Sequence, residues 1–292
     1  PLGLMCLAGS LESAGHEVRI LDLLATPESY SPLYEQLENF HPRVVGTTAV
    51  TMNFSLAADI LRDCKRIDPE IITVIGGPHV TFTHEETLSN HPYIDLIALG
   101  EGEETLAELV SALELKQDIN RIAGLALRHN GDIIYTGKRP LIKNLNSLPL
   151  PSHSLIPVSK YRALQTAFPI LSGRGCPGKC IFCVGQKMVG AQGRFRRADL
   201  VVAEIKRILA LGFNQINFAD DLFTYRKSHV QSICREIRQK KLDFSWSAFA
   251  RVDTVDEWIL DEMKSAGCSF LCFGVESANE DILKRIKKRI KL

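Results

Sequence analysis

The feature that most constrains this fold is a regular alternation of short apolar runs with longer segments of helical periodicity. In the first 115 residues we expect helices at 4–15, 33–40, 55–67, 84–90 and 103–115, and strands at 16–22, 44–49, 71–76 and 94–99. Strands that alternate with helices form a parallel sheet, and right-handed crossovers place helices on both of its faces. The alternation therefore predicts an α/β fold that begins with a doubly wound, Rossmann-like domain.

The second half repeats the alternation after an interruption. Residues 121–137 hold two apolar runs around Asn130-Gly131, a strong hairpin signal, and 138–160 carry four prolines, which is typical of a linker. Beyond them we expect strands at 168–172, 214–219, 244–250 and 269–275, and helices at 198–211, 227–241, 255–266 and 279–291. Four βα units in a row predict part of a TIM-type barrel. The expected organisation is a first domain at 1–120, a hairpin and linker at 121–160, and a barrel at 161–292.

Three strands of the first domain end in polar or glycine-rich turns. These turns contain Thr47, Thr48 and Thr51, then Gly76, Gly77 and His79, then Gly100, Glu101 and Gly102. In an open parallel sheet the ligand lies outside the carboxyl ends of the strands, where glycines allow a close approach and helix N-termini attract phosphate. One such turn can serve only to reverse the chain, but three on one edge predict a ligand site.

Three cysteines lie close together in the second half. Cys176, Cys180 and Cys183 have the spacing C-x3-C-x2-C, and the proline and glycines among them favour a non-helical path. A zinc site needs a fourth ligand and usually takes C-x2-C pairs, whereas three thiolates suit an iron–sulfur cluster whose fourth iron binds a small molecule. Buried core cysteines or half of a zinc ribbon are the alternatives. The other five cysteines are scattered in apolar or helical contexts, as expected for small hydrophobic residues.

Charged side chains follow the predicted barrel strands. They are Asp220, Asp221, Arg251 and Glu276. Active sites of such barrels lie at the carboxyl ends of the strands, and adjacent carboxylates repel each other unless they are paired or bound to a ligand. The alternative is a set of solvated loop charges or salt bridges between strand ends.

The cysteine spacing, after a short apolar strand, resembles the signature of the radical S-adenosylmethionine (SAM) enzymes. The segments at 1–4, 14–18, 45–48, 76–79 and 100–103 extend the resemblance to those radical SAM enzymes that carry an upstream cobalamin-binding domain. The resemblance implies a 4Fe-4S cluster on the three cysteines, with SAM on the open iron and cobalamin bound by the first domain. It also implies that the loop of Asp220 and Asp221 lines the SAM pocket, with Glu276 facing the polar part of SAM.

Two further residues have an expected role in this pocket. An arginine binds a carboxylate through two hydrogen bonds, so Arg251 is the candidate for the SAM carboxylate. Phe182 can shield the cluster or pack on adenine. The D-x-H-x-x-G loop that ligates cobalt in methionine synthase is absent from the sequence, and His16 is no substitute, so we expect no histidine on the lower face of the cobalt.

The activity implied by the resemblance is reductive cleavage of SAM at the cluster to a 5′-deoxyadenosyl radical. Methyl transfer to an unactivated carbon of a small molecule, or its cyclisation or rearrangement, would follow, as in a C-methyltransferase or an oxidative cyclase. An electron donor such as flavodoxin or ferredoxin would reduce the cluster. The alternatives are a radical SAM enzyme whose first domain no longer binds cobalamin, and a non-enzymatic cobalamin- or metal-binding protein. The sequence assigns neither a catalytic side chain nor the substrate.

Composition limits the remaining classes. The formal net charge of +1 does not favour a nucleic-acid surface, and no apolar run reaches the ~18 residues of a membrane span. Eight cysteines without a disulfide-like framework favour a reducing, cytoplasmic setting. The chain starts where a first strand would just have ended, and only four of the six barrel units of the family fit. We therefore expect a strand before residue 1 and further barrel after residue 292.

Overall fold

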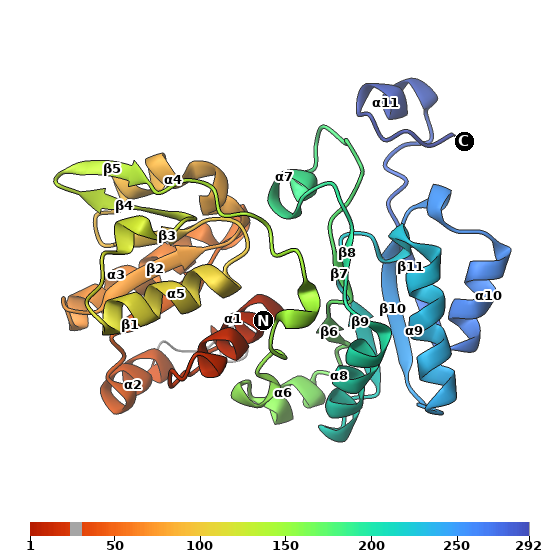
Figure 1. The fold of residues 1–292 in the computed structure, drawn as a ribbon, viewed down its shortest axis with the longest axis horizontal. Coiled ribbons are helices and arrows are strands. Elements are labelled where there is room, and N and C mark those ends of the chain that lie inside the picture. Colours follow the sequence, from red (N-terminus) through yellow and green to blue (C-terminus); the bar gives the residue numbers. More distant parts are fainter. Residues whose placement is uncertain (24–30, 292) are drawn as a thin grey trace. The chain divides into compact units, whose positions relative to one another are not determined.

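The structure is a computed structural model that describes residues 1–23 and 31–291 (Figure 1). It divides into two compact units. One contains residues 1, 3–141 and 149–156, and the other contains residues 2, 142–148 and 157–292. The segment 142–156 is therefore divided between the two units. Ser152 N donates a hydrogen bond to Met5 O within the first unit, whereas Arg194 Nη1 donates to Ile142 O within the second.

The first unit contains a five-stranded sheet with the order β1-β2-β3-β4-β5. Its strands are β1 (Val44–Thr48), β2 (Ile72–Gly76), β3 (Leu96–Ala98), β4 (Leu125–His129) and β5 (Asp132–Tyr135). The first three are parallel, and β4 and β5 add antiparallel strands to the edge formed by β3. The hairpin predicted at Asn130-Gly131 is confirmed, and both residues have the positive φ that such a tight turn requires.

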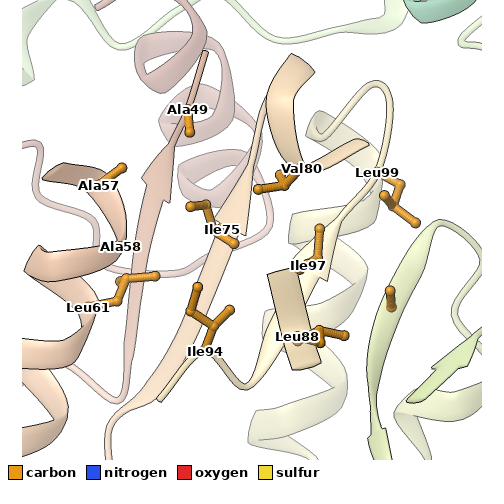
Figure 2. Close-up of a cluster of buried hydrophobic side chains, with 11 residues drawn as sticks. Ala49, Ala57, Ala58, Leu61, Ile75, Val80, Leu88, Ile94, Ile97 and Leu99 are labelled. Atoms are coloured by element: carbon orange, nitrogen blue, oxygen red, sulfur yellow. The ribbon is translucent and has the colours of Figure 1, made fainter. Parts of the chain in front are cut away.

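Helices cover both faces of this sheet, as the alternation predicts. They are α1 (Leu2–Ser13), α2 (Ser31–Phe40), α3 (Phe54–Ile67), α4 (Pro78–Asn90) and α5 (Glu103–Glu114). Ala58 and Leu61 of α3 and Leu88 of α4 pack with Ile75 and Ile97 on one face, as Figure 2 shows. On the other face, α5 packs against residues of β2, β3 and β4. The doubly wound architecture is therefore confirmed.

The second unit contains a parallel sheet with the order β11-β10-β9-β6. Its strands are β6 (Phe168–Ile170), β9 (Gln215–Phe218), β10 (Ser245–Ala250) and β11 (Cys268–Phe273), and its helices are α6 (Val158–Ala163), α7 (Gly185–Val189), α8 (Ala198–Ala210), α9 (Lys227–Gln239), α10 (Glu257–Ser265) and α11 (Glu280–Arg285). Neighbouring strands in chain order are neighbours in space, which confirms the predicted βα units. Alternate residues such as Phe218 and Trp246 are fully buried.

A separate two-stranded ribbon joins β7 (Gly173–Arg174) to β8 (Arg194–Phe195) in antiparallel pairing. The ribbon closes the base of the loop that carries the three cysteines. Short 3-10 turns lie at Thr51–Asn53, Ile119–Arg121, Leu145–Ser147, His153–Leu155, Phe223–Tyr225 and Val252–Thr254.

Two predicted elements are wrong. Residues 16–22 form no strand, because no neighbouring strand pairs with them among the described residues, and strand backbone needs such a partner. The helix expected over 279–291 extends only over Glu280–Arg285. Its continuation is broken at Lys287 and Arg289, whose positive φ angles of 56° and 59° are incompatible with a right-handed helix.

None of the helices within residues 1–23 and 31–291 combines the length and the apolar character needed to cross a bilayer.

Candidate cofactor sites

Hydrogen bonds join the three predicted turns at the carboxyl edge of the first sheet. Ala49 N, just after β1, donates to Gly76 O at 2.9 Å, and His79 N donates to Ala49 O at 3.1 Å. Gly100 N donates to Thr81 Oγ1 at 3.2 Å, and Thr81 Oγ1 donates to Gly77 O at 2.9 Å. The structure therefore brings the turns after β1, β2 and β3 together into one continuous edge.

Gly77 is indispensable to this edge. Its φ of 98° suits glycine, and an added Cβ would lie 2.7 Å from Ala49 O and 2.8 Å from Thr48 Oγ1. Gly77 also precedes α4, and Gly102 precedes α5, so two helix N-termini open onto the edge. Gly100 has a φ of 76° and open space around the position of a Cβ. Gly77 thus allows the turns to pack closely, and Gly100 leaves open space at the same edge.

The side chains at this edge make contacts within the first unit. Thr47 Oγ1 donates to Ala57 O of α3 and so serves the fold. The ring of His79 lies 3.2 Å from Thr51 Oγ1 through Nδ1 and packs on Phe54 with 4.3 Å between ring centroids. Sequence reasoning overlooked Met52, which is 98% exposed beside Thr51. A methionine between the polar residues Thr51 and Asn53 was the sequence signal for it.

The cysteine loop begins at Gly175 and returns to the ribbon at Gly193. Gly175 has a φ of 104°, and an added Cβ would lie 2.3 Å from Gln192 O, so only glycine fits where the two ends of the loop meet. Cys176 N donates to Gly190 O at 3.1 Å, which fixes the first cysteine. The loop is therefore closed by backbone contacts before its thiols are considered.

The thiols line the loop at positions that Gly178 and Gly185 define. A Cβ on Gly178 would lie 3.3 Å from Cys176 Sγ and 3.7 Å from Cys180 Sγ, so these two thiols border the same space. Gly185 N donates to Cys183 Sγ at 3.3 Å. Hydrogen bonds to sulfur are one of the means by which proteins set the reduction potential of iron–sulfur clusters. Burial raises the pKa of the Cys176 thiol, so iron would have to displace its proton.

No group of three or more His, Cys, Asp or Glu side chains in the described ranges is gathered closely enough to hold one metal ion. A four-iron cluster makes no such demand, because each thiolate binds a different iron. Three cysteine thiols on a glycine-rich loop, one of them accepting a backbone N–H bond, fit a cluster better than a single ion. Phe182, between the second and third cysteines, is 54% exposed.

Asp221 and Arg251 flank the loop. Asp221 follows β9, and its Oδ2 accepts a hydrogen bond from Gly175 N at 3.2 Å, while its Oδ1 lies 3.9 Å from the position of a Cβ on Gly185. Arg251 follows β10, and its Nη1 lies 3.8 Å from the position of a Cβ on Gly178. A carboxylate and a guanidinium therefore stand beside the cysteines, at the carboxyl ends of adjacent strands.

Arg251 is held by Asp253 and by the segment after α11. Its Nε and Nη2 donate to the two oxygens of Asp253, each at 2.8 Å, and Nη2 also donates to Lys288 O at 2.9 Å. The hydrogen bonds to Asp253 raise the pKa of Arg251 and lower the pKa of Asp253. Glu276 accepts from Lys288 Nζ at 2.9 Å, so it is linked to Arg251 through Lys288.

Asp220 differs from its neighbour. It is 3% exposed, and it accepts hydrogen bonds from Ser172 N at 2.7 Å and from Ser172 Oγ at 2.6 Å. Burial raises its pKa to about 6, against the lowering effect of these bonds. His229 lies 3.2 Å from Ser172 Oγ through Nε2, and burial lowers its pKa to about 4. Sequence reasoning missed Ser172 and His229 as partners of the acidic pair.

Two family models match the chain. The B12 binding domain matches residues 1–110, and the radical SAM superfamily matches residues 170–292. The chain belongs to the radical SAM enzymes that carry a cobalamin-binding domain. The family resemblance seen in the sequence is thereby confirmed, and the two matches fall on the two halves that hold the turn edge and the cysteine loop.

Relatives in this family carry different names. The chain is 38% identical to an uncharacterized methyltransferase of Pyrococcus horikoshii over 292 residues, 99% of this chain and 63% of that protein. It is 31% identical to the anaerobic magnesium-protoporphyrin IX monomethyl ester cyclase of a Synechocystis species, over 99% of this chain and 59% of that protein. The chain thus spans less than two thirds of the length of either relative.

A solved structure of the same family has the same fold. The radical SAM methyltransferase TsrM from Kitasatospora setae, solved with cobalamin and a 4Fe-4S cluster bound, matches with a TM-score of 0.83 and 21% identity. The match covers 97% of this chain and 57% of that chain.

Proposed function

We propose that the protein is a cobalamin-dependent radical SAM enzyme that methylates, cyclises or rearranges a small molecule at an unactivated carbon. The observation that carries the proposal is the cysteine loop, closed at its base by β7 and β8 and flanked by Asp221 and Arg251. When bound, the reduced cluster and SAM supply a 5′-deoxyadenosyl radical, and cobalamin supplies a methyl group. Relatives named as a methyltransferase and as a cyclase support both outcomes for this class.

The residues around the loop would bind and orient SAM. Cys176, Cys180 and Cys183 would hold the cluster, and the cluster would supply an iron to which SAM binds. Asp221 accepts hydrogen bonds from the amine or the ribose hydroxyls of SAM, because an exposed carboxylate suits cationic and hydroxyl donors. Arg251 already binds a carboxylate through two parallel hydrogen bonds, to Asp253. The N–H groups of Nη1 take no part in these bonds, so Arg251 can offer them to the carboxylate of SAM.

Glu276 and Phe182 complete this pocket. Glu276 faces the polar part of SAM once Lys288 releases it or shares it, and Phe182 covers the cluster or packs on the adenine. Both side chains have access to solvent, since Phe182 is 54% exposed and the Glu276 side chain 35% exposed. Positioning of this kind holds reacting atoms in place and excludes water, which is the part that a protein plays in cofactor chemistry.

The turn edge of the first unit would bind cobalamin. Its predicted residues are Thr47, Thr48, Thr51, Gly76, Gly77, His79, Gly100, Glu101 and Gly102. Gly100 leaves open space for a corrin-sized ligand to approach, and Gly77 lets the turns after β1 and β2 pack closely. The cobalt would have no protein histidine on its lower face. We further propose that a flavodoxin or ferredoxin reduces the cluster and that the enzyme works in the reducing cytoplasm.

Anaerobic reconstitution with iron, sulfide and cobalamin tests the proposal. We expect absorbance bands of both an iron–sulfur cluster and a corrin, and formation of 5′-deoxyadenosine when SAM and a reductant are added. Cluster bands alone would indicate a radical SAM enzyme without cobalamin. Corrin bands alone would indicate a non-enzymatic cobalamin protein, and either result would overturn the proposal.

A further inference from the structure

A buried chain of three polar side chains lies beneath the cysteine loop. Ser172, Asp220 and His229 come from the end of β6, the end of β9 and the start of α9, and they are 0%, 3% and 8% exposed. Ser172 Oγ donates a hydrogen bond to Asp220 Oδ2 at 2.6 Å. His229 Nε2, 3.2 Å from Ser172 Oγ, must therefore be the donor in that contact. His229 therefore donates a hydrogen bond to Ser172, and Ser172 donates one to Asp220.

Ser172 is the point where this chain meets the backbone that enters the loop. Its N–H donates to Asp220 Oδ1 at 2.7 Å, and its carbonyl accepts from Arg196 N at 2.9 Å. Three residues later, Gly175 N donates to Asp221 Oδ2 at 3.2 Å. The adjacent carboxylates Asp220 and Asp221 therefore hold the backbone on both sides of β7, just before Cys176.

The two carboxylates have different access to solvent. Asp220 is 3% exposed and both of its oxygens accept hydrogen bonds, whereas Asp221 is exposed. A buried carboxylate is tolerated only when hydrogen bonds compensate for its lost hydration. The donors from Ser172 meet this requirement and leave Asp220 no face for a ligand.

We propose that Asp220, through Ser172 and with the support of His229, is a positioning residue that sets the path of the backbone into the cysteine loop. Asp221 alone of the pair faces the cofactor. The inference rests on the proposed function only in taking Cys176 as a cluster ligand. Ser172 lies four residues before that ligand, so a change in its hydrogen bonds alters the angle at which the loop presents the first thiol.

The first test needs no cofactor. Amide hydrogen exchange of the peptide that covers 171–176 is measured in the apoprotein for Ser172→Ala, Asp220→Asn, His229→Gln and His229→Leu. We expect exchange to accelerate about tenfold to a hundredfold in the first two, as loss of a charge-assisted bond implies. His229→Gln keeps an N–H donor and should exchange more slowly than His229→Leu. Thr73→Val, which removes a buried hydroxyl in the other unit, should leave this peptide unchanged. Unaltered exchange in Ser172→Ala and Asp220→Asn overturns the proposal.

The second test separates positioning from direct contact with SAM. On reconstituted protein we expect Asp220→Asn and Ser172→Ala to change the paramagnetic resonance spectrum and the midpoint potential of the reduced cluster before SAM is added. The Asp220→Asn Ser172→Ala double variant should differ little from either single variant, because partners in one hydrogen bond are not additive. Wild-type spectra together with weaker SAM binding in Asp220→Asn alone would show that Asp220 contacts SAM. If the wild-type protein took up no cluster, the proposed function would fail, while the exchange experiment would still decide the role of Asp220.

Discussion

The turn edge of the first unit and the cysteine loop of the second both lie at the carboxyl ends of parallel strands, yet they are built by different means. The turn edge is assembled by backbone hydrogen bonds and by glycines such as Gly77, and most of its side chains are uncharged. The cysteine loop is held by carboxylates and an arginine, with Asp220, Asp221 and Arg251 around it. Backbone and glycine suit a large ligand recognised by shape, whereas charged side chains suit a small zwitterion such as SAM.

The largest expected effect is the loss of cluster binding by the cysteine loop without loss of corrin binding by the turn edge. Cys180→Ala should abolish the complete cluster, because the two remaining thiolates leave one of the three cysteine-ligated irons without its ligand. Corrin binding by the first unit should persist. Iron, sulfide and absorbance measured after anaerobic reconstitution provide the check. The exposed Cys272 lies outside the loop, so Cys272→Ser is the matched control and should bind a full cluster. A full cluster in Cys180→Ala would contradict the assignment.

The converse change is Gly77→Ala. An alanine there meets Ala49 O at 2.7 Å with a φ of 98°, and strain of this kind costs on the order of 1–3 kcal/mol. Corrin affinity should fall by about tenfold to a hundredfold, with cluster content unchanged. Gly131→Ala is the control, since its φ of 91° carries the same backbone penalty with open space around the Cβ. Equal corrin binding in both variants would show that the turn edge is not part of the cobalamin site.

The third prediction concerns charge recognition. Asp221→Ala and Glu276→Ala should each weaken SAM binding about tenfold to a hundredfold, because a shielded charge-assisted hydrogen bond contributes roughly 1.5–3 kcal/mol. Cluster content should persist, since the thiols are untouched. The measurement is a SAM titration of cluster-loaded protein, with Asp199→Ala, an exposed carboxylate paired with Arg197, as the control. Unchanged affinity and unchanged 5′-deoxyadenosine in both variants would make these carboxylates structural.

The smallest effect is a pH dependence in which two groups oppose each other. The pKa of Asp220 rises from 3.8 to about 6 on folding, so the folded state keeps a proton that the unfolded state has lost, and stability falls as pH rises through this window. The pKa of His229 falls from 6.5 to about 4, so its contribution to stability rises with pH over nearly the same window. The two slopes largely cancel in the intact protein.

Single variants should expose each slope. In Asp220→Asn the free energy of unfolding should rise between about pH 4 and pH 6, and in His229→Gln it should fall, by at most about 1.4 kcal/mol per pH unit. Denaturant titrations followed by the fluorescence of the buried Trp246 report on this unit. Slopes of the same sign in both variants would contradict the opposed pKa shifts.

The sequence was sufficient for the features that local patterns encode. Strand–helix alternation, the Asn130-Gly131 hairpin and the closely spaced cysteines each depend on neighbouring residues. The role of Ser172 depends on partners 48 and 57 residues away, which no local pattern can indicate. The difference between Asp220 and Asp221 is likewise a matter of burial, since the two residues are identical and adjacent. The false strand at 16–22 has suitable residues, but a strand also requires a neighbour.

The connection between the units limits how this protein can be recombined with its relatives. Residues 142–148 belong to the second unit, although residues 149–156, which follow them, belong to the first. Ile142 and Leu145 are buried, and Ser152 N donates to Met5 O in the first helix. A splice at residue 120 or residue 141 would strip the first unit of residues 149–156. A chimera that exchanges the first unit between family members should therefore be joined after Ile156. Its residues 142–148 should come from the protein that supplies the second unit.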